Sequence, residues 1–119
     1  MGNAAETMGK LDFLDTETAM VYFANMKELY VETVAVYLRD RFDAALQKDF
    51  DTEDWATYQR DAHSIKSSSN MIGAKDMFEK AKSLELAVKS GDYAFVKENH
   101  DNIMKDYKEL LDKIQNALQ

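Results

Sequence analysis

The stretch WATYQRDAHSIKSSSNMIGA, residues 55–74, decides the fold of this protein. Apolar side chains recur along it at steps of three and four residues, which is the period of an α-helix with one buried face. The members of this apolar face are Trp55, Tyr58, Ala62, Ile65 and Ile72. Gly73 interrupts the pattern, and its small size lets the chain fold back tightly. The stretch therefore predicts an amphipathic helix that ends in a turn.

Helical patterns also precede this stretch. Residues 15–24 predict a short helix with Asp15 as its N-cap. Residues 27–46 predict a longer helix, because their apolar positions again fall on one face. The helix of the opening stretch is expected to begin at an N-cap formed by Asp51 or Thr52, with acidic residues in its first turn.

Two further helices are expected after Gly73. Residues 74–88 repeat the amphipathic pattern and end before Gly91, a residue that tolerates the positive φ of a helix C-terminus. Asp92 is the predicted N-cap of the last helix, whose apolar face continues to Leu118.

Four amphipathic helices joined by short turns pack most easily as an up-down-up-down bundle. The chain contains no proline and four glycines, which favours long helices over a fold with many turns. We therefore predict an all-α fold: an up-down-up-down four-helix bundle with a short additional N-terminal helix. The bundle domain is expected over residues 13–119, after a flexible lead-in over residues 1–12.

Composition restricts the functional class. The 119 residues fit one domain, and the formal net charge of −7 argues against binding to nucleic acid or to an anionic membrane surface. There are no cysteines, so neither a disulfide framework nor a thiolate zinc site is expected. No apolar run is long enough to span a bilayer. The default expectation is a cytoplasmic protein.

His63 is expected to point out of the bundle. An α-helix turns by about 100° per residue, which places the apolar face roughly 140° or more away from His63. The side chains within about 60° of His63 are Gln59, Arg60, Lys66, Ser67 and Asn70. His63 therefore lies in the middle of a polar stripe that is unusually rich in small residues.

This arrangement suits phosphoryl chemistry. A neutral imidazole nitrogen can attack phosphorus without a separate base. Lys66, three residues on, supplies positive charge near a phosphoryl group on the ring. The small Ser67 leaves room for a second protein to approach. Gln59 and Asn70 are candidates for hydrogen bonds to the phosphoryl group or to that partner.

The segment His63-Ser64-Ile65-Lys66-Ser67-Ser68-Ser69, followed by Ile72-Gly73-Ala74, resembles the signature of histidine-containing phosphotransfer (HPt) domains of two-component phosphorelays. The family often has glycine at the position of Ser67, and serine is the smallest polar substitute. The resemblance covers roughly residues 14–118. Four further segments fit the family pattern: Leu29-Tyr30, Asp54-Trp55, Leu84-Glu85 and Ser90-Gly91-Asp92.

The resemblance implies a phosphoryl carrier. His63 would accept a phosphoryl group at Nε2 from the aspartyl phosphate of a receiver domain or from a hybrid kinase, and would pass it to the aspartate of another response-regulator receiver. The expected partners are receiver domains of response regulators and a sensor or hybrid histidine kinase. Lys66 would be the electrostatic partner of the phosphoryl group. Gln59, Ser67 and Asn70 would belong to the partner-facing surface. The receiver would bring the acidic pocket and Mg²⁺, so the chain is expected to bind no cofactor or metal and to act as a monomer.

Two other polar residues are interpreted as structural. His100 is not flanked by the basic and small polar residues that surround His63, and it is expected to be a surface histidine. Glu85 is expected to be a structural or solvated carboxylate.

The main alternative is a non-catalytic helical adaptor that binds a receiver or another partner without being phosphorylated. An enzyme in the usual sense has little support, because the sequence lacks the glycine-rich phosphate-binding loops and the H-E-x-x-H motif. A histidine-kinase dimerisation domain usually has an acidic residue directly after its histidine, whereas Ser64 follows His63 here.

Overall fold

The structure is a computed structural model that describes residues 3–119. Every regular element in that range is an α-helix, which confirms the predicted all-α class. The helices are α1 (Ala4–Lys10), α2 (Thr16–Tyr22), α3 (Lys27–Arg39), α4 (Asp43–Asp51), α5 (Trp55–Ile72), α6 (Lys75–Lys89) and α7 (Tyr93–Leu118). No helix in the described range combines the length and the apolar composition that crossing a membrane requires.

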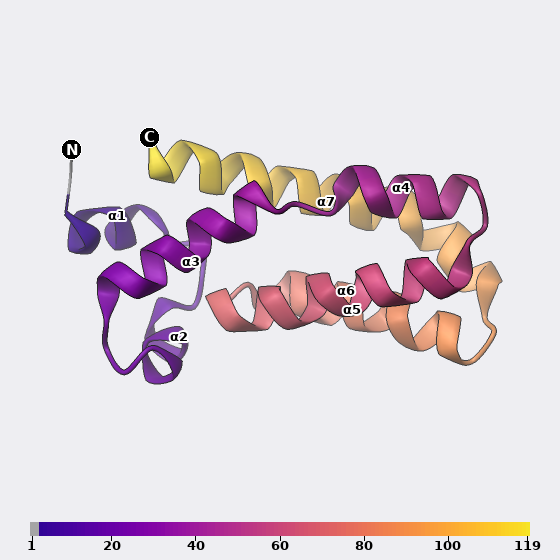
Figure 1. Ribbon diagram of the computed structural model, residues 1–119, viewed down its shortest axis with the longest axis horizontal. Helices are drawn as coiled ribbons and strands as arrows, with labels where there is room; N and C mark the ends of the chain where they lie inside the picture. The colour runs from indigo at the N-terminus through magenta and orange to yellow at the C-terminus, as the bar shows by residue number, and fades with distance from the viewer. Residues whose placement is uncertain (1–2) are drawn as a thin grey trace.

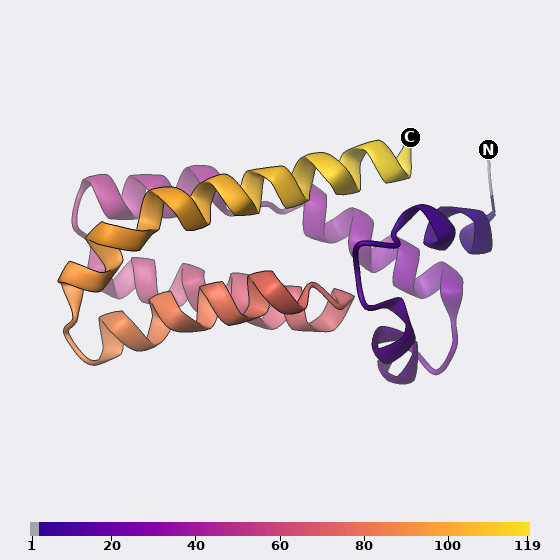
Figure 2. The same ribbon diagram turned by 180° about the vertical axis from the view of Figure 1, so that it is seen from behind.

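Helices α3 and α4 follow one another lengthwise and form one arm of a four-helix bundle, with α5, α6 and α7 as the other arms (Figure 1). Successive arms run in opposite directions, as the front and back views both show (Figures 1 and 2). α5 packs between the first arm and α6, and α7 closes the ring against α6 and the first arm. This arrangement confirms the predicted up-down-up-down bundle.

Helices α1 and α2 cover one end of the bundle, where the C-terminus also lies (Figure 1). α1 packs against α3 and α7, and α2 packs against α3 and α5. Leu11, directly after α1, is fully buried. The structure thus differs from the flexible lead-in expected over residues 1–12, because this segment has an apolar side chain to bury. Residues 1–2 lie outside the described residues, and the domain division at residue 12 stays a prediction.

Aspartates cap three of the helices. The side chains of Asp15 and Asp92 accept hydrogen bonds from the backbone N–H groups of the third helical residues, as predicted. The predicted cap of α5 is wrong, because Asp51 still belongs to α4 and Asp54 caps α5. Glu53, between Asp51 and Asp54, adopts a left-handed φ of 51°. The chain reverses direction there, and α5 begins about one helical turn after the N-cap that the sequence predicts.

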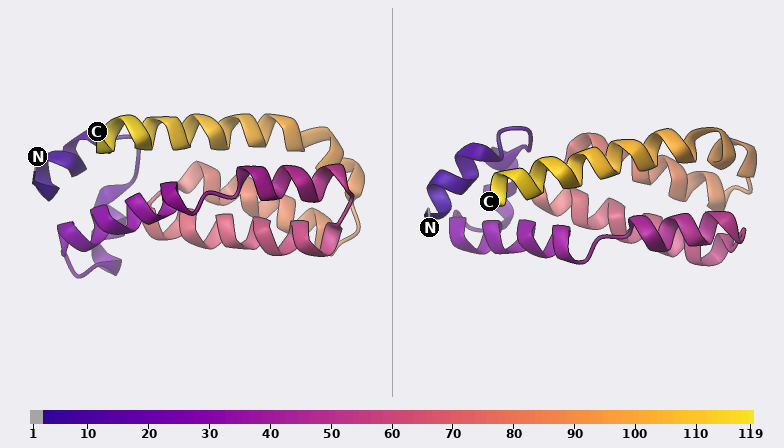
Figure 3. Two further views of the ribbon diagram at one scale, coloured as in Figure 1. Left: turned by 45° about the horizontal axis from the view of Figure 1, so that its top comes forward. Right: turned by 90° about the horizontal axis from the view of Figure 1, so that it is seen from above.

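The single helix predicted over residues 27–46 is also wrong, because the chain leaves the helical path between α3 and α4 (Figure 3). No proline or glycine lies there. Instead, the backbone N–H of Phe42 donates to the hydroxyl of Tyr107 in α7, at 3.1 Å. A hydrogen bond from a distant helix thus stabilises a break that has no local sequence signal.

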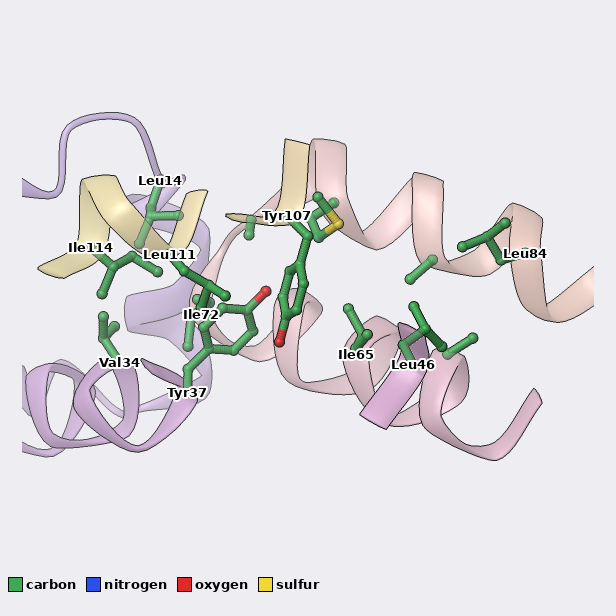
Figure 4. Packing of buried hydrophobic residues seen from close by; sticks show 14 of the residues in the cluster. Leu14, Val34, Tyr37, Leu46, Ile65, Ile72, Leu84, Tyr107, Leu111 and Ile114 are labelled. Carbon is green, nitrogen blue, oxygen red and sulfur yellow. The ribbon is translucent and has the colours of Figure 1, made fainter. Parts of the chain in front are cut away.

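The core is continuous along the bundle (Figure 4). Near its middle, the rings of Tyr37 and Tyr107 meet edge to face with centroids 6.3 Å apart. The Tyr37 hydroxyl forms a hydrogen bond with the buried Ser69 of α5 at 2.8 Å. Buried polar groups of one helix thus find their hydrogen-bond partners on another helix, and these contacts fix how α3, α5 and α7 pack.

His100 is fully buried, so the prediction of a surface histidine is wrong. Its ring stacks on Phe50 with centroids 3.9 Å apart. Its Nε2–H donates to Gln47 Oε1 at 3.0 Å, and its Nδ1 accepts from the Tyr58 hydroxyl at 2.8 Å. Burial lowers the pKa of His100, so this histidine is a neutral part of the core.

The turn between α5 and α6 is held from two directions. Gly73 adopts a left-handed φ of 84°, and a Cβ at this position would lie 2.5 Å from the backbone oxygen of Asp15. The Asp15 N–H donates to the Gly73 oxygen at 2.9 Å. The Tyr30 hydroxyl donates to the Ile72 oxygen at 2.7 Å. Asp15, before α2, and Tyr30, in the first turn of α3, thus stabilise the turn between α5 and α6. Gly73 forms this turn, as predicted.

Asp49 of α4 is buried, and its Oδ2 has no hydrogen-bond partner among residues 3–119. Burial and the neighbouring carboxylate of Asp61 in α5 raise the pKa of Asp49 well above its usual range. The neutral form of the Asp49 carboxyl group is therefore favoured, because an ionised Asp49 would be buried close to a second carboxylate.

We expect Gly73→Ala to lower the free energy of unfolding by about 3 kcal/mol or more, because a left-handed alanine costs about 1–2 kcal/mol before any clash is added. Gly91→Ala is the matched control, because Gly91 has a similar φ of 75° and nothing within 4 Å of the added Cβ. Its expected cost is about 1 kcal/mol. Urea unfolding measures both values, and equal losses would contradict the close approach to Asp15.

We expect the free energy of unfolding of Asp49→Asn to increase, relative to that of wild type, as pH rises from about 5 to about 8. The pKa of Asp49 is raised in the folded state, so wild type loses stability as pH rises between the unfolded and the folded pKa. The amide has no such titration. Urea unfolding at both pH values checks this, with Asp112→Asn on the exposed face of α7 as control; a pH-independent difference would contradict it.

Candidate functional site

Helix α5 presents His63 on its polar face. Tyr58, Ala62 and Ile65 of the same helix are buried in the core, whereas 58% of the His63 side chain is exposed. The ring therefore points away from the core, as the helical period predicts. A second protein can reach it without a change in the bundle.

One nitrogen of the exposed ring is bound to α6. His63 Nδ1 lies 2.6 Å from Oε2 of Glu85, which is nearly fully buried. The other oxygen of the same carboxylate, Oε1, accepts a hydrogen bond from Lys66 Nζ at 2.7 Å. Lys66 and His63 lie one turn apart on α5, so one carboxylate from the neighbouring helix binds both side chains.

The charge state of Glu85 follows from these contacts. Burial on its own raises the pKa of a carboxyl group, but the hydrogen bonds from Lys66 and His63 outweigh this effect and hold the pKa of Glu85 below its usual range. Glu85 is therefore an ionised carboxylate at neutral pH, and a carboxylate can only accept hydrogen bonds.

This constraint fixes the tautomer of His63. Because Glu85 accepts, Nδ1 carries the proton, and the lone pair of the neutral ring resides on Nε2. No group among residues 3–119 forms a hydrogen bond with Nε2 in the structure. The geometry can therefore offer an oriented, unprotonated nitrogen to an electrophile from solvent or from a partner.

The remaining predicted site residues lie around the ring but form no hydrogen bond with it in the described part of the chain. Gln59 is half-buried, one turn before His63, and lines an open hollow between α5 and α6. Ser67 is exposed, one turn after His63, and Asn70 is exposed a further turn along. The structure thus places all of these side chains on one stripe of α5.

An apolar groove begins beside this stripe, between α3 and α5. Ser64, Ser67 and Ser68 form its rim towards His63, and Tyr37 and Tyr107 contribute to its lining. Two large apolar side chains of this groove, Val36 and Met71, are exposed. The surface near His63 therefore has a hydroxyl-rich and apolar side towards α3 and a charged side towards α6.

Glu85 is the site residue that the sequence interpretation missed. A signal was available, because Ala81 and Val88 place the buried face of α6 on both sides of Glu85 at steps of four and three. A carboxylate on such a face needs a partner, but the partners lie on another helix, and the sequence alone does not pair the helices in register.

Residues 3–119 hold no group of three or more His, Cys, Asp and Glu side chains that could bind a metal ion. The absence of a metal or cofactor from the function of the chain stays a prediction.

Comparison with known proteins gives one positive result. The family model of the Hpt domain matches residues 25–119, which is most of the chain and includes α3 to α7. Comparisons with curated proteins and with solved structures gave no significant match. An exposed helical histidine on a four-helix bundle agrees with the matched family, and the chain therefore belongs to the Hpt domain family, whose members transfer phosphoryl groups through a histidine in phosphorelays.

Proposed function

We propose that His63 is the phosphoryl-carrying residue of this Hpt domain. It accepts a phosphoryl group from the aspartyl phosphate of a receiver domain, such as that of a hybrid kinase, and passes it to the aspartate of another response regulator. The observation that carries the proposal is the ring of His63, whose Nδ1 is held by buried Glu85 while its Nε2 faces solvent. The chain acts as a carrier and not as a kinase.

The transfer step requires no proton movement on this chain. The lone pair of Nε2 forms the P–N bond while the P–O bond to the receiver aspartate breaks, and the electron pair of that bond stays on the aspartate oxygen. The Nδ1 proton stays with the ring, so the phosphorylated ring is a cation beside the Glu85 carboxylate. In the onward step, an aspartate oxygen attacks phosphorus and the electron pair returns to Nε2.

Lys66 supports this chemistry in two ways. It supplies the positive charge near the phosphoryl group that the sequence predicts. Its hydrogen bond to Glu85 also favours the ionised carboxylate, which keeps the ring in the reactive tautomer. Mg²⁺ and the acidic residues that activate phosphorus come from the receiver, and this chain needs no cofactor of its own.

The surface around His63 suits transient docking of a receiver by a monomeric Hpt domain. Gln59, Ser67 and Asn70 supply polar contacts close to the ring. The exposed Val36 and Met71 of the neighbouring groove supply apolar area that a partner can bury. We expect the receiver to contact both sets when its aspartate reaches Nε2.

We expect incubation with a phosphorylated receiver and Mg²⁺ to give acid-labile, alkali-stable label on wild type and none on His63→Gln. Acid lability and alkali stability distinguish phosphohistidine from an acyl phosphate or a phosphoester. Circular dichroism at room temperature should give the same helical spectrum for both proteins, because the ring of His63 lies outside the core. Label that persists in the variant would refute the assignment of His63. No label from any receiver would favour the non-catalytic adaptor.

We expect Glu85→Gln to slow acceptance of the phosphoryl group by about tenfold or more, since a hydrogen bond to a charged group contributes about 1.5–3 kcal/mol. The ¹⁵N spectrum of the His63 ring should change from the Nδ1–H form to a mixture of tautomers. Glu79→Gln is the matched control, because Glu79 is exposed on the same helix. Unchanged rate and spectrum in Glu85→Gln would exclude a positioning role for Glu85.

A further inference from the structure

A hollow between α5 and α6 opens directly beside His63. Its α5 side includes Gln59, Arg60 and His63, and its α6 side includes Glu85 and Lys89. Two cationic side chains thus face a common space next to the exposed ring, in a chain whose formal net charge is −7. A phosphoryl group on Nε2 brings up to two negative charges to this place. Cations that contact its oxygens would offset them.

Lys66 is already engaged in the structure. Its Nζ donates to Glu85 Oε1 at 2.7 Å, and 22% of its side chain is exposed. The positive charge of Lys66 is therefore largely balanced by the buried carboxylate.

Lys89 is close to the ring but loosely held. Its Nζ lies 3.7 Å from Oε2 of Glu85, the oxygen that also binds His63 Nδ1. This separation is too long for a hydrogen bond, so the three N–H donors of the ammonium group stay available. About half of the side chain, 52%, is exposed. Lys89 can therefore turn towards a group on Nε2 without breaking a hydrogen bond to Glu85.

Arg60 completes the cationic lining from α5, three residues before His63. Its guanidinium forms no ion pair with a carboxylate in the described part of the chain, and the one side-chain hydrogen bond that it forms there, to Thr57 Oγ1, is 3.5 Å long. The guanidinium has five N–H donors in a planar fork that matches two oxygens of a phosphoryl group.

We infer that this hollow is a phosphoryl-binding site in which Arg60 and Lys89 contact the oxygens of a phosphoryl group on His63 Nε2. Lys66 is then chiefly a positioning residue that acts through Glu85. The inference rests on the proposed function, because it requires a phosphorylated His63. The two lysines then have different roles: Lys66 acts on the ring through Glu85, and Lys89 contacts the oxygens of the phosphoryl group that His63 carries.

The test uses phosphoramidate as a phosphodonor that needs no partner protein. After its removal, ³¹P NMR follows the loss of the phosphohistidine signal in the full chain. In the loose transition state of hydrolysis, charge is spread over the phosphoryl oxygens, and cations that contact these oxygens stabilise it. We expect Arg60→Gln and Lys89→Gln each to lengthen the half-life by about two- to fivefold, and the double variant to lengthen it further.

Lys105→Gln, on the exposed face of α7, is the matched control and should leave the half-life unchanged. Lys89→Arg should restore it, because the charge and the donors are kept. In wild type, the side-chain ¹⁵N signals of Arg60 and Lys89 should shift on phosphorylation. The ¹⁵N pattern of the unphosphorylated His63 ring should be the same in Lys89→Gln as in wild type.

A double variant with the half-life of wild type would overturn this inference while leaving the proposed function intact. An altered His63 tautomer in Lys89→Gln would also overturn it, since the effect would then act through Glu85. Wild type that gives no phosphohistidine with phosphoramidate or with any phosphorylated receiver would instead remove the proposed function on which the inference rests.

Discussion

A carboxylate that is almost completely removed from water organises the candidate site. Burying an ionised group costs free energy unless hydrogen bonds and opposite charge compensate it. Glu85 receives this compensation from His63 Nδ1 and Lys66 Nζ, one on each oxygen. The contact therefore determines the orientation of the ring, its tautomer and the position of Lys66 at once. Removal of Glu85 would leave both His63 Nδ1 and Lys66 Nζ without this partner, and removal of His63 or Lys66 would leave one buried carboxylate oxygen without its hydrogen bond.

The contact also depends on the register between α5 and α6. The two helices are joined by the turn at Gly73, and this turn determines which residue of α6 lies opposite His63. Asp15 and Tyr30 bind the backbone of the turn from outside the hairpin. The N-terminal segments thus contribute to the site at a distance: they keep the hairpin in the register that brings Glu85 to His63. Gly73 therefore contributes to the geometry around His63 although it lies beyond the end of α5.

Sequence reasoning succeeded where local information determines the structure. The period of apolar residues predicted α5, α6 and α7, and the caps at Asp15 and Asp92 follow from the preference of a single side chain. It failed where the cause lies on another helix. The break before α4 depends on the hydroxyl of Tyr107, and nothing in the residues around Phe42 indicates it. The polar face around His63 was predictable, but the bond that orients the ring was not.

The two histidines of the chain show why residue type alone could not decide the site. His100 occupies the apolar stripe of α7, four residues after Val96, and both of its ring nitrogens are used by neutral partners, the buried Tyr58 and the half-buried Gln47. Such a ring has no free lone pair and no path to a partner protein. His63 has one nitrogen bound to an ionised carboxylate and the other free at the surface. The number of unengaged ring nitrogens, and not the presence of imidazole, is therefore what distinguishes a structural histidine from one that can carry a phosphoryl group.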